Sequence, residues 1–103
     1  MIFINSQGAT SPRKWQHGTG AIFVTGTFNS NQLRLEFRPD GGDVEDWFNV
    51  KDVYGDPVTA QSQSQQNFTL PNGDLRVVLS EGSSSGIAVY VNIVALAQAE
   101  KSL

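Results

Sequence analysis

The chain has 103 residues, of which 39% are hydrophobic, and this is enough for one domain with one modest core. Its charged fraction of 17% is too low for a disordered acidic polymer, and its net charge of -3 argues against a protein that holds nucleic acid on a broad basic face. The chain has no cysteine, which excludes disulfides and thiolate metal sites.

The N-terminal segment has no usable periodic pattern over residues 5–19. Residues 1–5 lack the basic segment and long apolar stretch of a secretory signal, and no apolar run in the chain approaches the ~20 residues needed to cross a bilayer. We therefore expect a soluble protein made without processing. Small and basic residues dominate residues 5–19, which predicts an extended N-terminal arm over residues 1–19.

Alternation of apolar and polar residues predicts strands in most of the remaining chain. In residues 33–38 the apolar side chains take one face and the charges take the other, as in a half-buried strand. Residues 75–79 repeat this pattern. Residues 87–94 are apolar on nearly both faces, which predicts a strand that is central or covered by a partner. Further strands are predicted at residues 20–28, 47–53 and 68–70.

Turn-forming residues separate these strands, and no amphipathic helix of useful length is present. The Gln- and Ser-rich run 61–66 is predicted to be an exposed, mobile loop. Short strands joined by turns favour an all-β antiparallel β-sandwich, immunoglobulin-like or alternatively a jelly roll. We expect the sandwich domain to span residues 20–95 and a C-terminal tail to span residues 96–103. The turns are predicted at residues 29–31, 39–43, 54–57, 71–74 and 82–86.

No catalytic constellation is visible, so we expect a protein that is not an enzyme and has no cofactor. His17 is the only histidine, it lies in the predicted arm, and no Gly-x-Ser-x-Gly motif accompanies it. Four carboxylates gather in the turn near residues 40–46, where oxygen ligands could in principle hold calcium. Their spacing does not match an EF-hand loop, so a solvated turn without metal is the expectation. These carboxylates are Asp40, Asp43, Glu45 and Asp46.

Trp15 is the aromatic residue that the predicted strands do not accommodate. Trp47 and Phe48 fit a strand of the sandwich, and Tyr90 is expected on the covered face of the last strand. Trp15 has no evident core to enter and stands among basic residues, which predicts an anchor on a partner surface. Pairing of residue 3 and its neighbours with a partner's sheet edge is a further expectation. The predicted partner contacts are Ile2, Phe3, Ile4, Arg13, Lys14, Trp15 and His17.

The stretch from residue 18 to residue 94 resembles small β-sandwich capsid decoration, or cement, proteins of tailed bacteriophages. The resemblance is carried by residues 20–28, residues 33–37, an Asp-rich turn that ends in Trp47, residues 70–78 and a Ser- and Gly-rich turn before the last strand. In such proteins, extensions of the sandwich commonly grip neighbouring shell subunits. The resemblance therefore implies the same role for the arm and the tail.

The resemblance implies a virion structural protein that binds the lattice of the major capsid protein and stabilises the head. It would be made in the host cytoplasm and lie on the outer capsid surface, with neither nucleic acid nor membrane as a partner, and it could form dimers or trimers. The alternative is a carbohydrate-binding or adhesion module. That alternative predicts exposed aromatic side chains aligned on one face, whereas the capsid hypothesis predicts an arm that is disordered when free.

Overall fold

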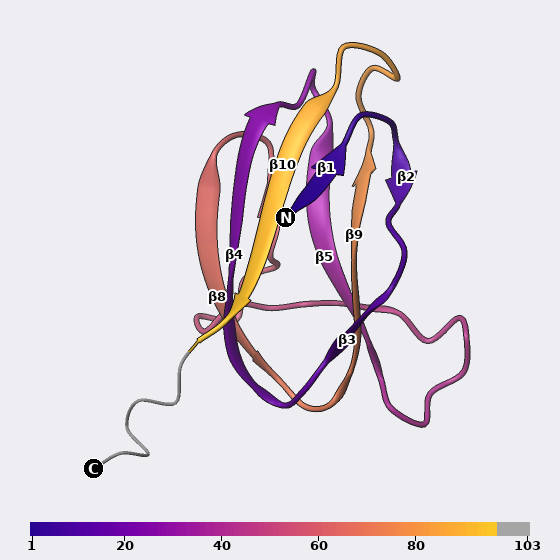
Figure 1. The fold of residues 1–103 in the computed structure, drawn as a ribbon, viewed down its shortest axis with the longest axis vertical. Helices are drawn as coiled ribbons and strands as arrows, with labels where there is room; N and C mark the ends of the chain where they lie inside the picture. Colours follow the sequence, from indigo (N-terminus) through magenta and orange to yellow (C-terminus); the bar gives the residue numbers. More distant parts are fainter. Residues whose placement is uncertain (97–103) are drawn as a thin grey trace.

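Two antiparallel sheets pack face to face in a computed structural model that describes residues 1–96 (Figure 1). Both sheets contain strands that are distant in the sequence. The first sheet has the order β1 (Ile2–Ile4), β10 (Ala88–Ala95), β4 (Gly18–Thr27), β8 (Ser64–Leu70). The second sheet follows the path β2 (Gly8–Ala9), β9 (Gly73–Ser80), β5 (Gln32–Pro39), β6 (Phe48–Asn49), with β3 (Arg13–Trp15) on β9 and β7 (Thr59–Ala60) on β5. The expected antiparallel β-sandwich is confirmed.

The core lies between the two sheets and is built from the alternating positions of the long strands. In β5, Leu33, Leu35 and Phe37 are buried, while the charged residues between them lie on the outer side. The last long strand, β10, is central because it pairs with β1 on one side and β4 on the other. Its alternate residues Val89 and Val91 are fully buried. The strands predicted at residues 20–28, 33–38, 75–79 and 87–94 are therefore present.

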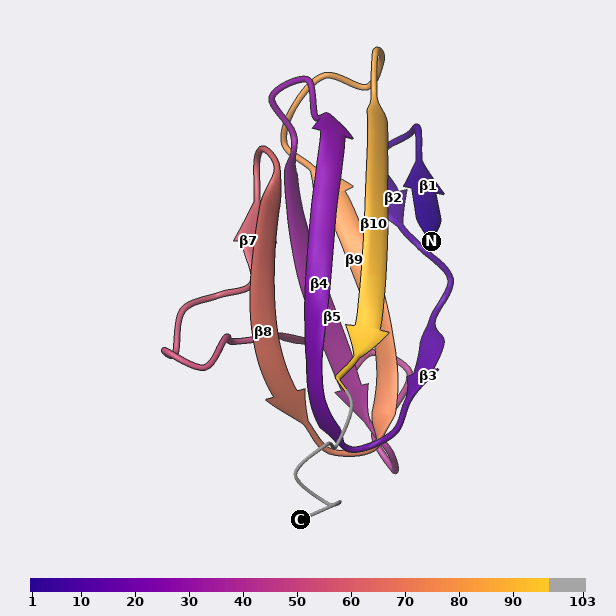
Figure 2. The same ribbon diagram turned by 60° about the vertical axis from the view of Figure 1, so that its left-hand side comes forward.

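The N-terminal segment is part of both sheets. Strand β1 pairs with β10 in the first sheet, and the chain then crosses to the second sheet, where β2 and β3 pair with β9 (Figure 2). Paired strands thus replace the expected extended arm over much of residues 1–19. The physical reason is that β10 and β9 would otherwise leave neighbouring sheet edges open, and this segment supplies their hydrogen-bonding partners.

Two further expectations are corrected. The run 61–66 was expected to be a loop, but its second half begins β8, which pairs with β4 from Ser64 onwards. Residues 47–53 were expected to form one strand, but only β6 and an isolated bridge from Lys51 to Pro57 form there. The expected tail, residues 96–103, lies outside the described residues except for Leu96, whose backbone N–H donates to Thr19 O at 3.0 Å.

A fully buried asparagine joins three connecting segments at one end of the sandwich. The side-chain nitrogen of Asn31 donates to the carbonyl oxygens of Phe28 and Ser83, each at 2.8 Å. Its side-chain oxygen accepts from the Gln7 amide at 2.8 Å and from the Gly82 N–H at 3.0 Å. Because these partners satisfy the buried amide, they hold the turn after β4, the turn after β9 and the segment after β1 together.

Candidate functional site

The strands of the first sheet have no charged side chain on their outer face. Strands β1, β10, β4 and β8 contain no Lys, Arg, Asp, Glu or His, although 17% of the chain is charged. Alternation places the outward side chains of these strands on one surface. We call this surface the neutral face; its larger outward residues are Phe3, Tyr90, Asn92, Val94, Thr19, Phe23, Thr25, Gln65, Asn67 and Thr69.

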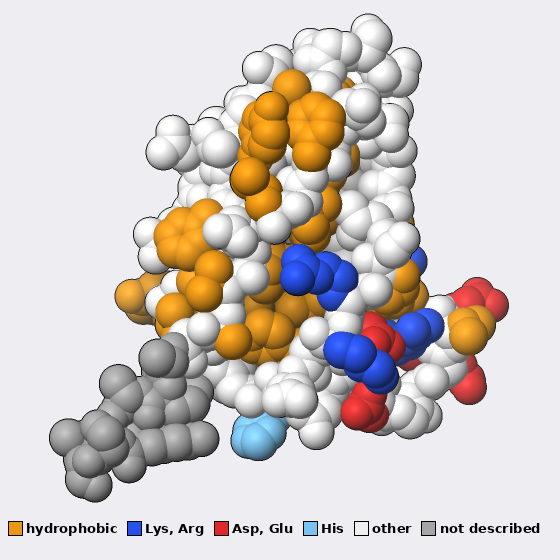
Figure 3. All heavy atoms as spheres, in the orientation of Figure 1, with side chains coloured by type: hydrophobic (Ala, Val, Ile, Leu, Met, Phe, Trp, Pro, Cys, Tyr) orange, Lys and Arg blue, Asp and Glu red, His pale blue; other side chains and the backbone are white. Residues whose placement is uncertain are grey.

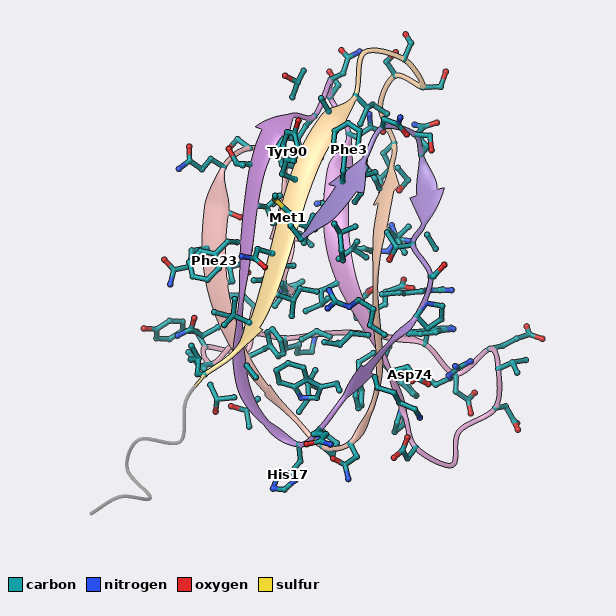
Figure 4. The ribbon with its side chains drawn as sticks, viewed as in Figure 1. Met1, Phe3, His17, Phe23, Asp74 and Tyr90 are labelled. Carbon is teal, nitrogen blue, oxygen red and sulfur yellow. The ribbon has the colours of Figure 1, made fainter. Side chains whose placement is uncertain are left out.

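Three exposed aromatic side chains lie on the neutral face: Phe3 and Tyr90 lie together, and Phe23 lies apart from them towards β8 (Figures 3 and 4). Phe3 lies opposite Tyr90, with ring centroids 4.9 Å apart and planes tilted by 40°. Tyr90 lies opposite Thr25, and Phe23 is the outward residue two positions before Thr25, so the two rings occupy diagonal positions. Phe3 is 52% exposed, and Phe23 and Tyr90 are each 41% exposed. The expectation that Tyr90 is covered is wrong.

The other outward side chains of the neutral face are small, aliphatic or uncharged polar groups. The hydroxyls of Thr19 and Thr69 lie 3.0 Å apart across β4 and β8. Asn92 and Gln65 flank Phe23 on the neighbouring strands. This arrangement can cover a partner's apolar surface with aromatic rings while amide and hydroxyl groups hydrogen-bond around them.

The outer face of the second sheet has the opposite chemistry. Glu36 is nearly buried between two arginines, at 3.0 Å from Arg34 and 2.8 Å from Arg76. Asp74 pairs with Arg38 at 2.9 Å and with Lys14 at 3.6 Å. These pairs join β3, β9 and β5 across the sheet.

Trp47 packs on this charged face. Its ring lies under the guanidinium groups of Arg76 and Arg38, at 4.1 Å and 4.7 Å from the ring centroid. Its Nε1–H donates to Val44 O at 3.1 Å. The strand predicted at residues 47–53 would place Phe48 in the core, but Phe48 is 58% exposed. The two cation–π contacts therefore anchor the Asp-rich turn to the sheet.

The Asp74 carboxylate is held in its charged form. A hydrogen bond from the Arg38 guanidinium is the largest cause that lowers its pKa below the usual 3.8; burial opposes it, and the positive charges of Lys14 and Arg38 add to the lowering. The group belongs to the ion-pair network of this face.

The predicted partner contacts are divided between the core and the surface. Ile4 and Trp15 are buried and so are not available to a partner, whereas Ile2 is partly buried against the core. Trp15 lies against Phe68 with ring centroids 5.1 Å apart, and its buried Nε1 has no hydrogen-bond partner. The prediction that Trp15 anchors a partner surface is therefore wrong. Phe3 is exposed on the neutral face, but as a strand residue already paired with β10.

The basic residues of the predicted contact set remain on the surface, away from the aromatic cluster. Arg13 and Lys14 line a cavity of ≈ 290 Å³ beside Leu75 and Ile93, and Lys14 also reaches the carboxylates of Asp74 and Asp40. The side chain of His17 is exposed at the end of the molecule where β3 leads into β4, as Figure 4 shows. Its backbone N–H donates to Asn72 Oδ1 at 2.6 Å.

The acidic turn after β5 is closed by its own hydrogen bonds. The Asp46 carboxylate accepts from the Asp43 N–H at 2.9 Å. Among residues 1–96, no group of three or more His, Cys, Asp or Glu side chains is placed to hold a metal ion. No helix in this part of the chain is long and apolar enough to span a membrane.

The neutral face was not found from the sequence, although the sequence contains a signal for it. Residues 20–28 and 87–94 are both free of charge, and each has one aromatic residue, Phe23 or Tyr90, that alternates with core residues. Only the pairing of β10 with β4 shows that these residues share one surface.

Comparisons with protein-family models, curated proteins and solved structures give no match for this chain.

Proposed function

We propose that this chain is a non-catalytic virion structural protein that docks on the outer surface of a capsid through its neutral face. The proposed docking mode rests on one observation: the four strands have three exposed aromatic rings and no charged side chain. The buried centres of protein interfaces are depleted in charged residues and enriched in aromatic ones. A sheet face of this composition is suited to a protein surface.

The proposal that the partner is the capsid lattice rests on the resemblance of residues 18–94 to phage decoration proteins. A protein that binds only the assembled lattice stabilises that state by its binding free energy, and many copies multiply the effect. The proposed contact is a sheet face and not an arm, because Trp15 and Ile4 belong to the core. Docking therefore needs no ordering of residues 1–19.

We infer an immunoglobulin-like arrangement of the strands. In that fold, strand B lies between A and E in one sheet while C pairs with F in the other. Here β4 and β8 match the B–E pair, and β5 and β9 match the C–F pair. The last strand, β10, takes the place of strand A beside β4. The jelly roll is the alternative, because β4 with β10 and β5 with β9 also form nested pairs.

The test is co-sedimentation with empty capsids assembled from the major capsid protein of the same genome. We expect wild-type protein to sediment with the capsids and Phe23→Glu to bind at least about tenfold more weakly, because the substitution buries an unpaired charge in the interface. Phe48→Glu is the matched control, since Phe48 is a similarly exposed aromatic residue on the other sheet. Failure of the wild type to sediment would reject the capsid as partner. Equal binding of both variants would reject the neutral face.

A carbohydrate-binding module is the second candidate, favoured by the alignment of Phe3, Tyr90 and Phe23 on one face beside Asn92 and Gln65. Aromatic faces stack on sugar rings, and amides hydrogen-bond sugar hydroxyls. A glycan array tests this candidate. Saturable binding that Tyr90→Ala weakens would support it over capsid docking.

A further inference from the structure

One sheet edge differs from the other three. The edges at β1, at β2 and β3, and at β6 and β7 are formed by strands of two or three residues, whereas β8 has seven residues. Along its whole length β8 pairs with β4 on one side, and no strand within residues 1–96 pairs with its other side. Figure 2 shows β7 beside that side, but β7 pairs with β5 of the second sheet. The outer side of β8 therefore presents a row of backbone donors and acceptors.

Strand β8 also lacks the features that protect open edges. Proteins commonly block such edges with charged residues, proline, bulges or very short strands. The sequence of β8, SQQNFTL, has no charge and no proline, and Pro71 comes only after its last residue. Unbroken pairing of all seven residues with β4 leaves the strand regular. The edge is thus open to pairing with a further strand.

We propose that the occupant of this edge is β8 of a second copy of the chain, paired antiparallel about a two-fold axis at Asn67. This register places Asn67 opposite itself and Gln65 opposite Thr69 on the exposed side, so amides and hydroxyls meet across the junction. Each of these side chains can both donate and accept hydrogen bonds. The self-complementary pattern favours a second copy over an unrelated strand.

Charge favours the same occupant. The chain carries a net charge of -3, so two copies repel each other at most approaches. The first sheet has no charged residue, and the ion pairs lie on the second sheet. Approach through β8 therefore brings together the neutral parts of two acidic molecules.

The dimer would have one continuous sheet. A two-fold axis perpendicular to the sheet keeps both neutral faces on the same side, so the docking surface doubles in area. Seven residues at about 3.4 Å each give an edge only ~24 Å long, which is small for a stable interface, and so we expect weak association. The dimer does not depend on the partner proposed for the neutral face.

The absence of native cysteine allows a direct test on the full chain. Residues directly opposite each other in antiparallel strands lie within the Cα separation of a disulfide, about 4.4–6.8 Å. We therefore expect Asn67→Cys to form a covalent dimer under mild oxidation. Thr25→Cys is the control, because Thr25 is exposed on the same face but on the central strand β4. Equal cross-linking of both variants would overturn the proposal, since it would indicate face-to-face or random contact.

A second measurement uses reversible association in sedimentation equilibrium from ~10 μM to ~1 mM, a range suited to a weak dimer. We expect wild type to dimerise, and Asn67→Lys and Asn67→Asp each to weaken association at least about tenfold by setting like charges opposite each other. An equimolar mixture of the two variants should associate again. A wild type that stays monomeric over the whole range would overturn the proposal, as would a mixture that associates no better than either variant alone. Circular dichroism checks that both variants keep the wild-type fold.

Discussion

Trp15 lies in the core because Gly20 leaves space for its indole ring. A Cβ atom at residue 20 would clash with the Trp15 six-membered ring and would lie 2.9 Å from Phe68 Cζ, which is closer than real contacts allow. The indole thus packs directly on the backbone of β4 and against Phe68. The glycine is required by this close approach and not by its backbone conformation.

We predict that Gly20→Ala lowers the free energy of unfolding by about 1–3 kcal/mol, because the added methyl group overpacks the core. The measurement is urea unfolding followed by circular dichroism. In a Trp15→Phe background the same substitution should cost less, since the clashing benzene portion of the indole is gone. Equal costs in both backgrounds would show that Trp15 is not the residue that excludes a side chain at position 20.

At the scale of the strands, ion pairs connect β3 to the second sheet. Lys14 on β3 and Arg38 on β5 both contact Asp74 on β9, so this carboxylate links three neighbouring strands. The hydrogen bond from Arg38 is the largest cause of its lowered pKa. A group whose pKa is lowered by folding stabilises the folded state above its unfolded pKa, and this contribution disappears as the pH falls through the folded value.

We predict that Asp74→Asn destabilises the protein at pH 7 and that the difference from wild type shrinks when the pH falls below about 4. The measurement is the free energy of unfolding in urea at pH 7 and at the lowest pH where both proteins still fold. Glu45→Gln is the control, because Glu45 is exposed and has no ion pair among the described residues. A difference that stays constant with pH would mean that Asp74 is not stabilised by its charge.

Strand length decides how much of the fold could be predicted from the sequence. Strands β5 and β9 have eight residues each, long enough for alternation to be visible, and both were predicted. Strands β2 and β7 have two residues each, and no period can be recognised over two residues. Strand β8 was only partly predicted because its first residues are uniformly polar. Gln66 lies on the side of β8 that faces the interior although it is polar. Its side-chain amide donates a hydrogen bond to Thr59 O at 2.6 Å.

The composition of the neutral face could be predicted from the sequence, but the relative positions of its residues could not. The lack of charge in the strands of the first sheet is visible in the sequence, whereas the neighbourhood of Phe3, Tyr90 and Phe23 depends on pairing between the two ends of the chain. Trp15 was misplaced for a related reason. Its burial depends on space at Gly20 and on Phe68, which is distant in the sequence.

At the scale of the whole molecule, charge is separated between the two outer faces. In the second sheet the charged residues of β5 and β9 form ion pairs, as between Glu36 and Arg76, while the strands of the first sheet have no charged residue. The N-terminal segment binds these two halves together, since β1 closes the first sheet and β2 and β3 close the second. The same segment also supplies Ile4 and Trp15 to the common core.

We predict that deletion of residues 1–17 abolishes cooperative unfolding near the wild-type midpoint. Loss of a buried Trp side chain alone costs about 3–5 kcal/mol, and the total stability of a domain is typically about 5–15 kcal/mol. The deletion also exposes the edges of β10 and β9. The measurement is circular dichroism during urea unfolding of the shortened chain.

The double substitution Arg13→Ala with His17→Ala is the control for this deletion. Both side chains are exposed, so it should leave the unfolding midpoint close to that of wild type. If the shortened chain instead unfolds cooperatively at the wild-type midpoint, β1 and β3 are dispensable, and residues 1–17 act as a detachable arm after all. The experiment therefore separates an edge-closing segment, in which Trp15 completes the core, from an arm that is free to engage a partner.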